Sequence, residues 1–229
     1  MIDFPLVDFN EAHTHRLLSS AYVDEPAIAP LYDDDDEKEI LDALEARTSS
    51  RLLGQAGKLD EVSPGELLTE TFGYGWTYVN AAFVYTRVGG NRFNGEGRGA
   101  WYAALAVETC LAEVGFHLTR ELKNTGETEN TTQYVQLLAH IAGRMASLVG
   151  REGEPCLDPD TAVGYPAGQK LAEEMRGQGL GGIIYPAVRH AGGTCIATLR
   201  PDCIRQVTRG ASYRLVWSGG KGPEVVFVK

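Results

Sequence analysis

Residues 89–117 read GGNRFNGEGRGAWYAALAVETCLAEVGFH and hold the two strongest structural signals of this sequence. The first half belongs to a glycine-rich segment, VGGNRFNGEGRG, with five glycines between Val88 and Gly99. So many glycines exclude a helix and predict an irregular turn whose backbone can approach a ligand closely. In the second half, apolar residues recur with the spacing of one helical face: Val107, Cys110, Leu111, Val114 and Leu118. We therefore predict a helix over residues 104–120, directly after the turn.

The remaining patterns predict a chain that mixes helices and strands, an α+β fold. Residues 15–32 are expected to be a strand or extended segment ending at Pro26 and Pro30. The run DDDDE at 33–37 reads as the acidic first turn of a helix or, alternatively, as a partner-binding acidic tail. Residues 75–86, GWTYVNAAFVYT, predict a strand because aromatic and β-branched residues dominate them. Further helices are expected at 131–149 and 168–176, and strands at 183–185, 194–199, 213–217 and 225–228, the last two joined through SGGKG.

Composition narrows the functional classes. The chain has 229 residues, 43% of them hydrophobic and 23% charged, which fits one globular domain with a substantial core. Its net charge of -10 disfavours binding to a nucleic-acid backbone, although a small anion can still occupy a local basic pocket. The acidic start MIDFPLVDFN and the absence of a long apolar run argue against a leader or a membrane span, so a cytoplasmic protein is expected. Four cysteines without a CxxC pair predict reduced thiols.

The glycine turn holds the first candidate for chemistry. No phosphate-binding P-loop, dinucleotide fingerprint, zinc-protease motif or nucleophile elbow occurs in the sequence. The turn does carry Arg92 and Arg98, and Arg92 is followed by Phe93 and Asn94. A guanidinium beside free backbone N–H groups suits a pyrophosphate, whereas the alternative is two ordinary surface charges.

The helix supplies a second candidate. Glu113 and His117 are spaced i, i+4 on the flank of the apolar stripe, so they lie on one side of the predicted helix. Such a pair can belong to a metal site, or it can be a surface carboxylate near an imidazole. The other histidines have no spacing that completes a ligand set, and no metal is expected.

The segment 89–117 resembles the core motif of the RES-domain family, the toxin halves of bacterial toxin–antitoxin pairs. The motif is an Arg in a glycine turn, an aromatic residue and an Asn after it, then a Tyr-Ala pair and a Glu eleven residues beyond that Tyr. Two weaker matches flank it. HRLLSSAY at 15–22 is similar to the family's N-terminal Arg motif, and GIIYPAVRHAGGTC at 182–195 is similar to its C-terminal strand motif.

The resemblance implies a single domain over 1–229, with 1–50 as an N-terminal extension packed on it. It also implies a fold related to the diphtheria-toxin type of ADP-ribosyltransferase, with a mixed β-sheet core and flanking helices. NAD would be the substrate, bound by Arg16, Arg92 and Asn94. Tyr102 would pack on the nicotinamide side, and Glu113 would be the catalytic carboxylate.

Three functions follow as alternatives. The first is an NAD-cleaving toxin, a glycohydrolase or phosphorylase, in which Glu113 stabilises an oxocarbenium-like transition state. The second is a mono-ADP-ribosyltransferase that modifies a host metabolic enzyme. The third is a non-catalytic binding module, which Ala187 motivates because it stands where the family has its serine. Either the serine hydroxyl is dispensable in this chain, or another residue such as Thr194 supplies its hydrogen bond, or the chain is attenuated. The implied partner is a helix-turn-helix antitoxin that occludes the active site.

Overall fold

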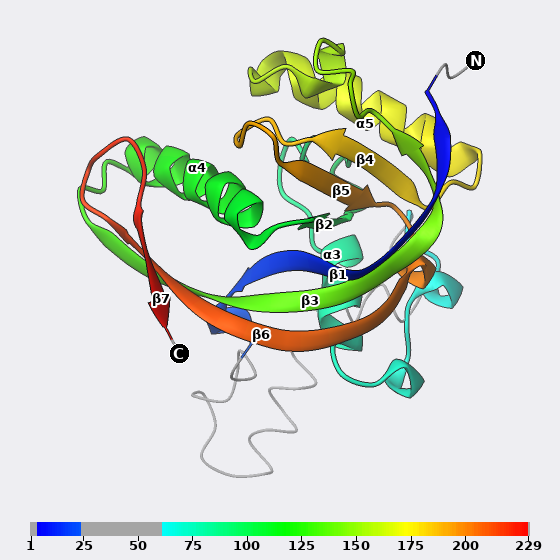
Figure 1. The fold of residues 1–229 in the computed structure, drawn as a ribbon, viewed down its shortest axis with the longest axis horizontal. Helices are drawn as coiled ribbons and strands as arrows, with labels where there is room; N and C mark the ends of the chain where they lie inside the picture. Colours follow the sequence, from blue (N-terminus) through cyan, green and yellow to red (C-terminus); the bar gives the residue numbers. More distant parts are fainter. Residues whose placement is uncertain (1–3, 24–60, 229) are drawn as a thin grey trace.

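The computed structural model describes residues 4–23 and 61–228. Their strands form one strongly bent sheet in the order β1-β2-β5-β4-β3-β6-β7, in which β1 also pairs with β3 (Figure 1). Strands β1, β2, β5, β4 and β3 therefore close a ring, and β6 and β7 extend from β3. The strands are β1 (Leu6–Ser19), β2 (Trp101–Ala104), β3 (Asn130–Ser147), β4 (Gly182–Pro186), β5 (Thr194–Thr198), β6 (Ile204–Trp217) and β7 (Glu224–Val228). The α-helices are α3 (Trp76–Val84), α4 (Val107–Thr125) and α5 (Thr161–Gly177).

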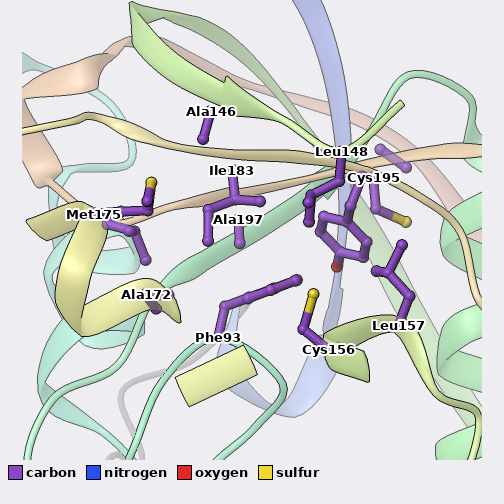
Figure 2. Packing of buried hydrophobic residues seen from close by; sticks show 14 of the residues in the cluster. Phe93, Ala146, Leu148, Cys156, Leu157, Ala172, Met175, Ile183, Cys195 and Ala197 are labelled. Carbon is purple, nitrogen blue, oxygen red and sulfur yellow. The ribbon is translucent and has the colours of Figure 1, made fainter. Parts of the chain in front are cut away.

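The short strands β2, β4 and β5 are buried on both faces. Because side chains alternate along a strand, Trp101, Ile184 and Ile196 pack in one cluster with β3, β6 and α3. Their neighbours Tyr102, Tyr185 and Ala197 pack in or against a second cluster with α4 and α5. Figure 2 shows Phe93 and Cys156 gathered with Ile183 and Ala197 in this second cluster. Helices α4 and α5 thus lie on the side of the sheet where the glycine-rich turn also packs, and α3 lies on the other side.

Helix α4 confirms the prediction for 104–120, shifted toward the C-terminus. Val107, Leu111 and Val114 of the predicted stripe pack against the core, and Cys110 is buried. The helix ends at Gly126, which adopts a left-handed conformation and donates its N–H to the Leu122 and Lys123 carbonyls.

The strand predicted at 75–86 is wrong, because these residues form helix α3. The buried residues of α3 are Val79, Asn80, Phe83 and Val84, and their spacing is that of one helical face. Because Asn80 is polar, this spacing is not visible as an apolar pattern in the sequence. Asn80 has no exposed surface, and its amide side chain pairs with both the N–H and the carbonyl of Leu68. Tertiary contacts therefore override the strand-like composition.

The helix predicted at 131–149 is also wrong, because this stretch is strand β3. Its apolar residues fit a helical face, but Val135, Leu137, Ala139 and Ile141 equally fit the alternation of a strand and are all buried. Pairing decides between the two patterns. Strand β3 bonds to β1 along one edge and to β6 and β4 along the other.

The other elements are close to prediction or longer. Strand β1 begins at Leu6, well before residue 15, and ends at Ser19. Helix α5 starts at Thr161, seven residues earlier than predicted, and Asp160 caps it by accepting the N–H of Ala162. The predicted C-terminal strands are present as β4 to β7, with β6 beginning at Ile204. The α+β class is confirmed, whereas the region after Val23 expected to extend to Tyr32 and the helix after 33–37 lie outside the described residues.

Two expectations about the whole chain can be compared with this fold. All four cysteines are free and buried, as predicted for reduced thiols. Within residues 4–23 and 61–228, no helix is both long and apolar enough to cross a membrane.

Candidate active site

A cavity of about 230 Å³ lies where β1, β2, α4 and the glycine-rich turn meet. It brings together four of the five predicted site residues: Arg16, Arg92, Tyr102 and Glu113. These residues come from β1, the turn, β2 and α4, so the bent sheet is what assembles them. Residues that were not predicted for the site also line the cavity, among them Tyr165, Tyr185 and Arg189, and so does His117.

Arg92 is held rigidly at the edge of this cavity. Only 8% of its surface is exposed, and one guanidinium nitrogen donates to the carbonyls of Cys156 at 2.6 Å and Asp158 at 3.0 Å. Helix α5 makes room for it with two glycines, since a Cβ on Gly164 or on Gly168 would lie within 2.6 Å of Arg92 atoms. The remaining guanidinium N–H groups are thereby fixed next to the cavity.

Arg16 lines the same cavity from strand β1. Its guanidinium stacks over Trp101, 4.6 Å from the ring centroid, and donates to the Tyr102 carbonyl at 3.0 Å. Burial lowers the pKa of Arg16 to about 10, so the group is still a cation at neutral pH. A partly buried cation, Arg16, and a buried one, Arg92, thus line one small cavity.

Tyr102 and Asn94 tie strand β2 to the glycine-rich turn. The Tyr102 hydroxyl accepts the Phe93 N–H at 2.9 Å and donates to the Asn94 side-chain oxygen at 2.9 Å. Its ring lines the cavity, and burial raises its pKa, so the hydroxyl stays protonated. Asn94 itself is 1% exposed and is not part of the cavity lining. Its contacts are those of a residue that shapes the turn, unlike the other four.

Glu113 points from α4 into the cavity toward the turn that connects β4 and β5. Burial raises the pKa of its carboxyl. Opposing this, the carboxylate accepts the backbone N–H of Arg189 at 3.3 Å, and the charges of Arg189 and Arg92 favour the ionised form. The site therefore holds a desolvated carboxylate against a small number of fixed donors and cations.

His117 lies one helical turn after Glu113 and also lines the cavity. Burial lowers the pKa of His117 to about 4, and the charges of Arg87, Arg120, Arg189 and Arg92 act in the same direction. The imidazole is therefore neutral at neutral pH. The cavity lining holds the acidic Glu113 but also Arg16, Arg92 and Arg189. The cavity is therefore cationic, although the chain as a whole has a net charge of -10.

Arg189 is the most informative residue that sequence reasoning missed. Its guanidinium stacks on Phe116, 3.7 Å from the ring centroid, and donates to the Pro159 carbonyl at 2.6 Å. It belongs to the C-terminal motif 182–195, and an Arg two residues after Ala187 is the signal that could have identified it. Ala187 and Thr194, both in the described part of the chain, do not line the cavity.

Arg98, the other arginine of the turn, lies elsewhere. It pairs with Glu66 through both guanidinium nitrogens and lines a second, larger cavity with Arg200 and Asp202. Its role is to hold the chain around Glu61 and Glu66 in place. Within residues 4–23 and 61–228, no group of three or more His, Cys, Asp or Glu side chains is arranged to hold a metal ion.

The fold and this site define an α+β domain with a cationic cavity around one partly buried carboxylate. The RES domain model matches residues 69–218, so the chain belongs to the RES-domain family. Among solved structures, the chain is similar to one in the crystal structure of the M. tuberculosis MbcT–MbcA toxin–antitoxin complex, with 13% identity and a TM-score of 0.45. That alignment covers 92% of this chain and 86% of the other. No curated protein matches the sequence.

Proposed function

We propose that this chain is a toxin that cleaves the nicotinamide–ribose bond of NAD. The observation that carries the proposal is a partly buried carboxylate, Glu113, facing a cavity lined by Arg16, Arg92 and Arg189 in a RES domain. A dinucleotide combines a pyrophosphate, which arginines bind well, with a glycosidic bond whose cleavage develops positive charge. The relation of the fold to diphtheria-toxin-type ADP-ribosyltransferases stays part of this proposal.

Glu113 has the central role in the proposed chemistry. As the nicotinamide leaves, the ribose ring gains oxocarbenium character, and a nearby carboxylate stabilises that charge. Preorganised charge of this kind typically lowers a barrier by ~3–4 kcal/mol. The helix holds Glu113 in place because its neighbouring residues on α4 are packed in the core.

The arginines and Tyr102 position the substrate in this proposal. Arg16 and Arg92 bind the pyrophosphate, which carries the same charge in substrate and transition state, so they contribute mainly to affinity. Tyr102 offers its ring to the nicotinamide while its hydroxyl remains bonded to the turn. Asn94 acts through that bond, by shaping the turn around Arg92.

The acceptor determines the outcome of the reaction. Water or phosphate as acceptor makes the chain a glycohydrolase or phosphorylase, and a protein side chain makes it a mono-ADP-ribosyltransferase. Purified protein incubated with labelled NAD, alone and with cell lysate, separates these outcomes by free products and by labelled proteins. If no NAD were consumed and no protein became labelled, the binding-module alternative would remain and the proposal would be refuted.

The sharpest test of the site compares two glutamates of helix α4. Glu113→Gln should slow nicotinamide release roughly 10²–10³-fold, whereas Glu121→Gln, an exposed position on the same helix, should not change it. Full activity in Glu113→Gln would remove Glu113 from the mechanism.

A toxin of this kind needs an inhibitor in its own cell, and we propose a helix-turn-helix antitoxin. Occlusion would be most direct if an inserted carboxylate or C-terminus paired with Arg16 or Arg92. The acidic chain, at net charge -10, would favour a basic patch on that partner. Co-purification with the product of the adjacent gene tests binding, and undiminished NAD turnover by the complex would exclude occlusion.

A further inference from the structure

The turn between β4 and β5 is a compact unit that rests on the start of helix α4. It is closed by hydrogen bonds from the Ala187 N–H to the Gly193 carbonyl at 2.8 Å and from the Gly193 N–H to the His190 carbonyl at 3.0 Å. Gly192 has a positive φ of 80°. These bonds give residues 187–193 a defined shape, which fixes the direction of the Arg189 N–H within the turn.

Two residues of α4, one helical turn apart, contact consecutive residues of that turn. The Thr109 hydroxyl is 2.9 Å from Nδ1 of His190, and the Glu113 carboxylate accepts the Arg189 N–H at 3.3 Å. Residues spaced i, i+4 face the same side of a helix, so both bonds join the same two surfaces.

The Thr109 contact is tightly built. Thr109 has no exposed surface, and the turn packs so closely that a Cβ on Gly193 would lie 2.6 Å from the Thr109 hydroxyl oxygen. A buried hydroxyl without a hydrogen-bond partner destabilises the folded state. The Thr109 hydroxyl therefore depends on the His190 imidazole as its partner.

From this geometry we propose that Thr109 and His190 are positioning residues for Glu113. Their hydrogen bond fixes the 187–193 turn on α4, which keeps the Arg189 N–H on the carboxylate. The inference rests on the proposed role of Glu113 in catalysis, but it makes a claim about the turn that can be measured without any reaction.

Loosening the 187–193 turn should change the pKa of Glu113 in one direction. The Arg189 N–H is among the groups that favour the ionised carboxylate, against the effect of burial. A loosened turn therefore raises the pKa of Glu113 further and misplaces the carboxylate. The other titratable or charged groups that interact with Glu113 come from α4, the glycine-rich turn and strands β4 and β5, namely Cys110, Arg92, Tyr185 and Cys195, together with Arg189 itself.

The experiment compares three variants of the full chain. Thr109→Val removes the hydroxyl at nearly constant volume, and Thr109→Ser keeps it. Thr119→Val is the matched control, because Thr119 is also a buried threonine of α4, but its hydroxyl bonds to the Gly115 carbonyl of the same helix. Amide hydrogen exchange of 187–193 and NMR titration of the Glu113 carboxyl are measured first, then nicotinamide release.

Thr109→Val should speed exchange in the turn roughly tenfold and raise the pKa of Glu113. It should also lower kcat about tenfold with little change in KM for NAD, since the binding arginines are untouched. Thr109→Ser should restore most of each property, and Thr119→Val should alter none of them beyond its effect on global stability.

Unchanged exchange and an unchanged Glu113 titration in Thr109→Val would overturn the inference, as would equal effects from Thr119→Val. If the wild-type chain released no nicotinamide, the proposed function would fail. The exchange and titration results would then still decide whether Thr109 and His190 position Glu113.

Discussion

Arg92 crosses helix α5 directly above Gly168, where an added Cβ would lie 2.1 Å from the Arg92 carbonyl oxygen. Gly164, one helical turn earlier, is similarly close to the Arg92 guanidinium. Two successive turns of α5 therefore carry a glycine where they contact Arg92. A glycine in a helix interior is ordinarily unfavourable. The position of the arginine therefore depends on a helix that supplies only one side chain, Tyr165, to the cavity lining.

Gly168→Ala should displace the glycine-rich turn. Overpacking of this kind costs typically ~1–3 kcal/mol, and here it should also weaken NAD binding because Arg92 moves. Gly177→Ala is the control, because nothing lies within 4 Å of its added Cβ at the end of the same helix. Thermal unfolding and NAD affinity measured on both variants check this. Equal behaviour of the two would show that the turn adapts easily.

Arg92→Ala should raise KM for NAD more than it lowers kcat. In the proposed function the guanidinium contacts phosphate in both the bound substrate and the transition state, so its loss should be mainly a loss of uniform binding. Steady-state kinetics give both constants, and circular dichroism checks the fold, because Cys156 and Asp158 lose a hydrogen-bond donor. An unchanged KM would contradict a phosphate-binding role.

Glu113→Gln should stabilise the fold at neutral pH. The raised pKa of Glu113 means that the folded state binds its proton more tightly than the unfolded chain does. That stabilisation is complete below the ordinary pKa of 4.5 and is lost as pH rises through the folded value, so ionised Glu113 destabilises the protein. The gain in Tm of the variant should therefore grow with pH above 4.5 and then level off, and Glu121→Gln should show no such trend. A variant less stable than wild type at pH 7 would refute this sign.

The same carboxylate sets the expected acid limb of activity. Turnover should fall as Glu113 is protonated, at a pH above that of an ordinary glutamate with a pKa of 4.5. A profile of kcat against pH in the wild-type chain measures this limb. An acid limb at or below 4.5 would mean that burial does not govern the titration of Glu113.

His117 should make the protein sensitive to acid. Its pKa is lowered from 6.5 to about 4 in the folded chain, so the unfolded chain takes up the proton first as pH falls. Stability supplied by the neutral imidazole is complete above 6.5 and is lost as pH falls toward 4. Denaturant unfolding at several pH values should show this loss in wild type and in His13→Gln, an exposed control, but not in His117→Gln. The same pH dependence in all three proteins would exclude His117 as its source.

Ala187→Ser should leave activity unchanged or increase it. Ala187 is partly buried beside the core, and its backbone N–H closes the turn that holds Glu113. A hydroxyl added there meets the family pattern without removing a contact. Nicotinamide release by the variant is the measurement, and a large loss would show that this turn is packed around the smaller side chain.

Particular residues explain what the sequence could predict. Helix α4 was predictable because its apolar stripe fits one periodicity, whereas the apolar residues of β3 fit two, and only pairing with β1 and β6 distinguishes them. Helix α3 was missed because Asn80, a polar residue, occupies a buried position.

The candidate site was also predictable only in part. The family motif placed Arg16, Arg92, Tyr102 and Glu113, which do line one cavity. Tyr165 and Arg189 were missed because one lies in the part of α5 before residue 168 and the other in a turn, where neither periodicity nor spacing marks a cavity-facing side chain. Asn94 lies in the predicted turn, but in the structure its side chain bonds to Tyr102 and does not line the cavity.

The walls of the cavity are drawn from almost the whole length of the chain, from Arg16 on β1 to Cys195 on β5. During synthesis, the first of these residues leaves the ribosome long before the last one exists. A nascent chain or an N-terminal fragment therefore cannot complete the pocket, whatever local structure it forms. Under the proposed function, chains that end before β5 should therefore lack NAD-cleaving activity, and only chains that include β5 should need an inhibitor.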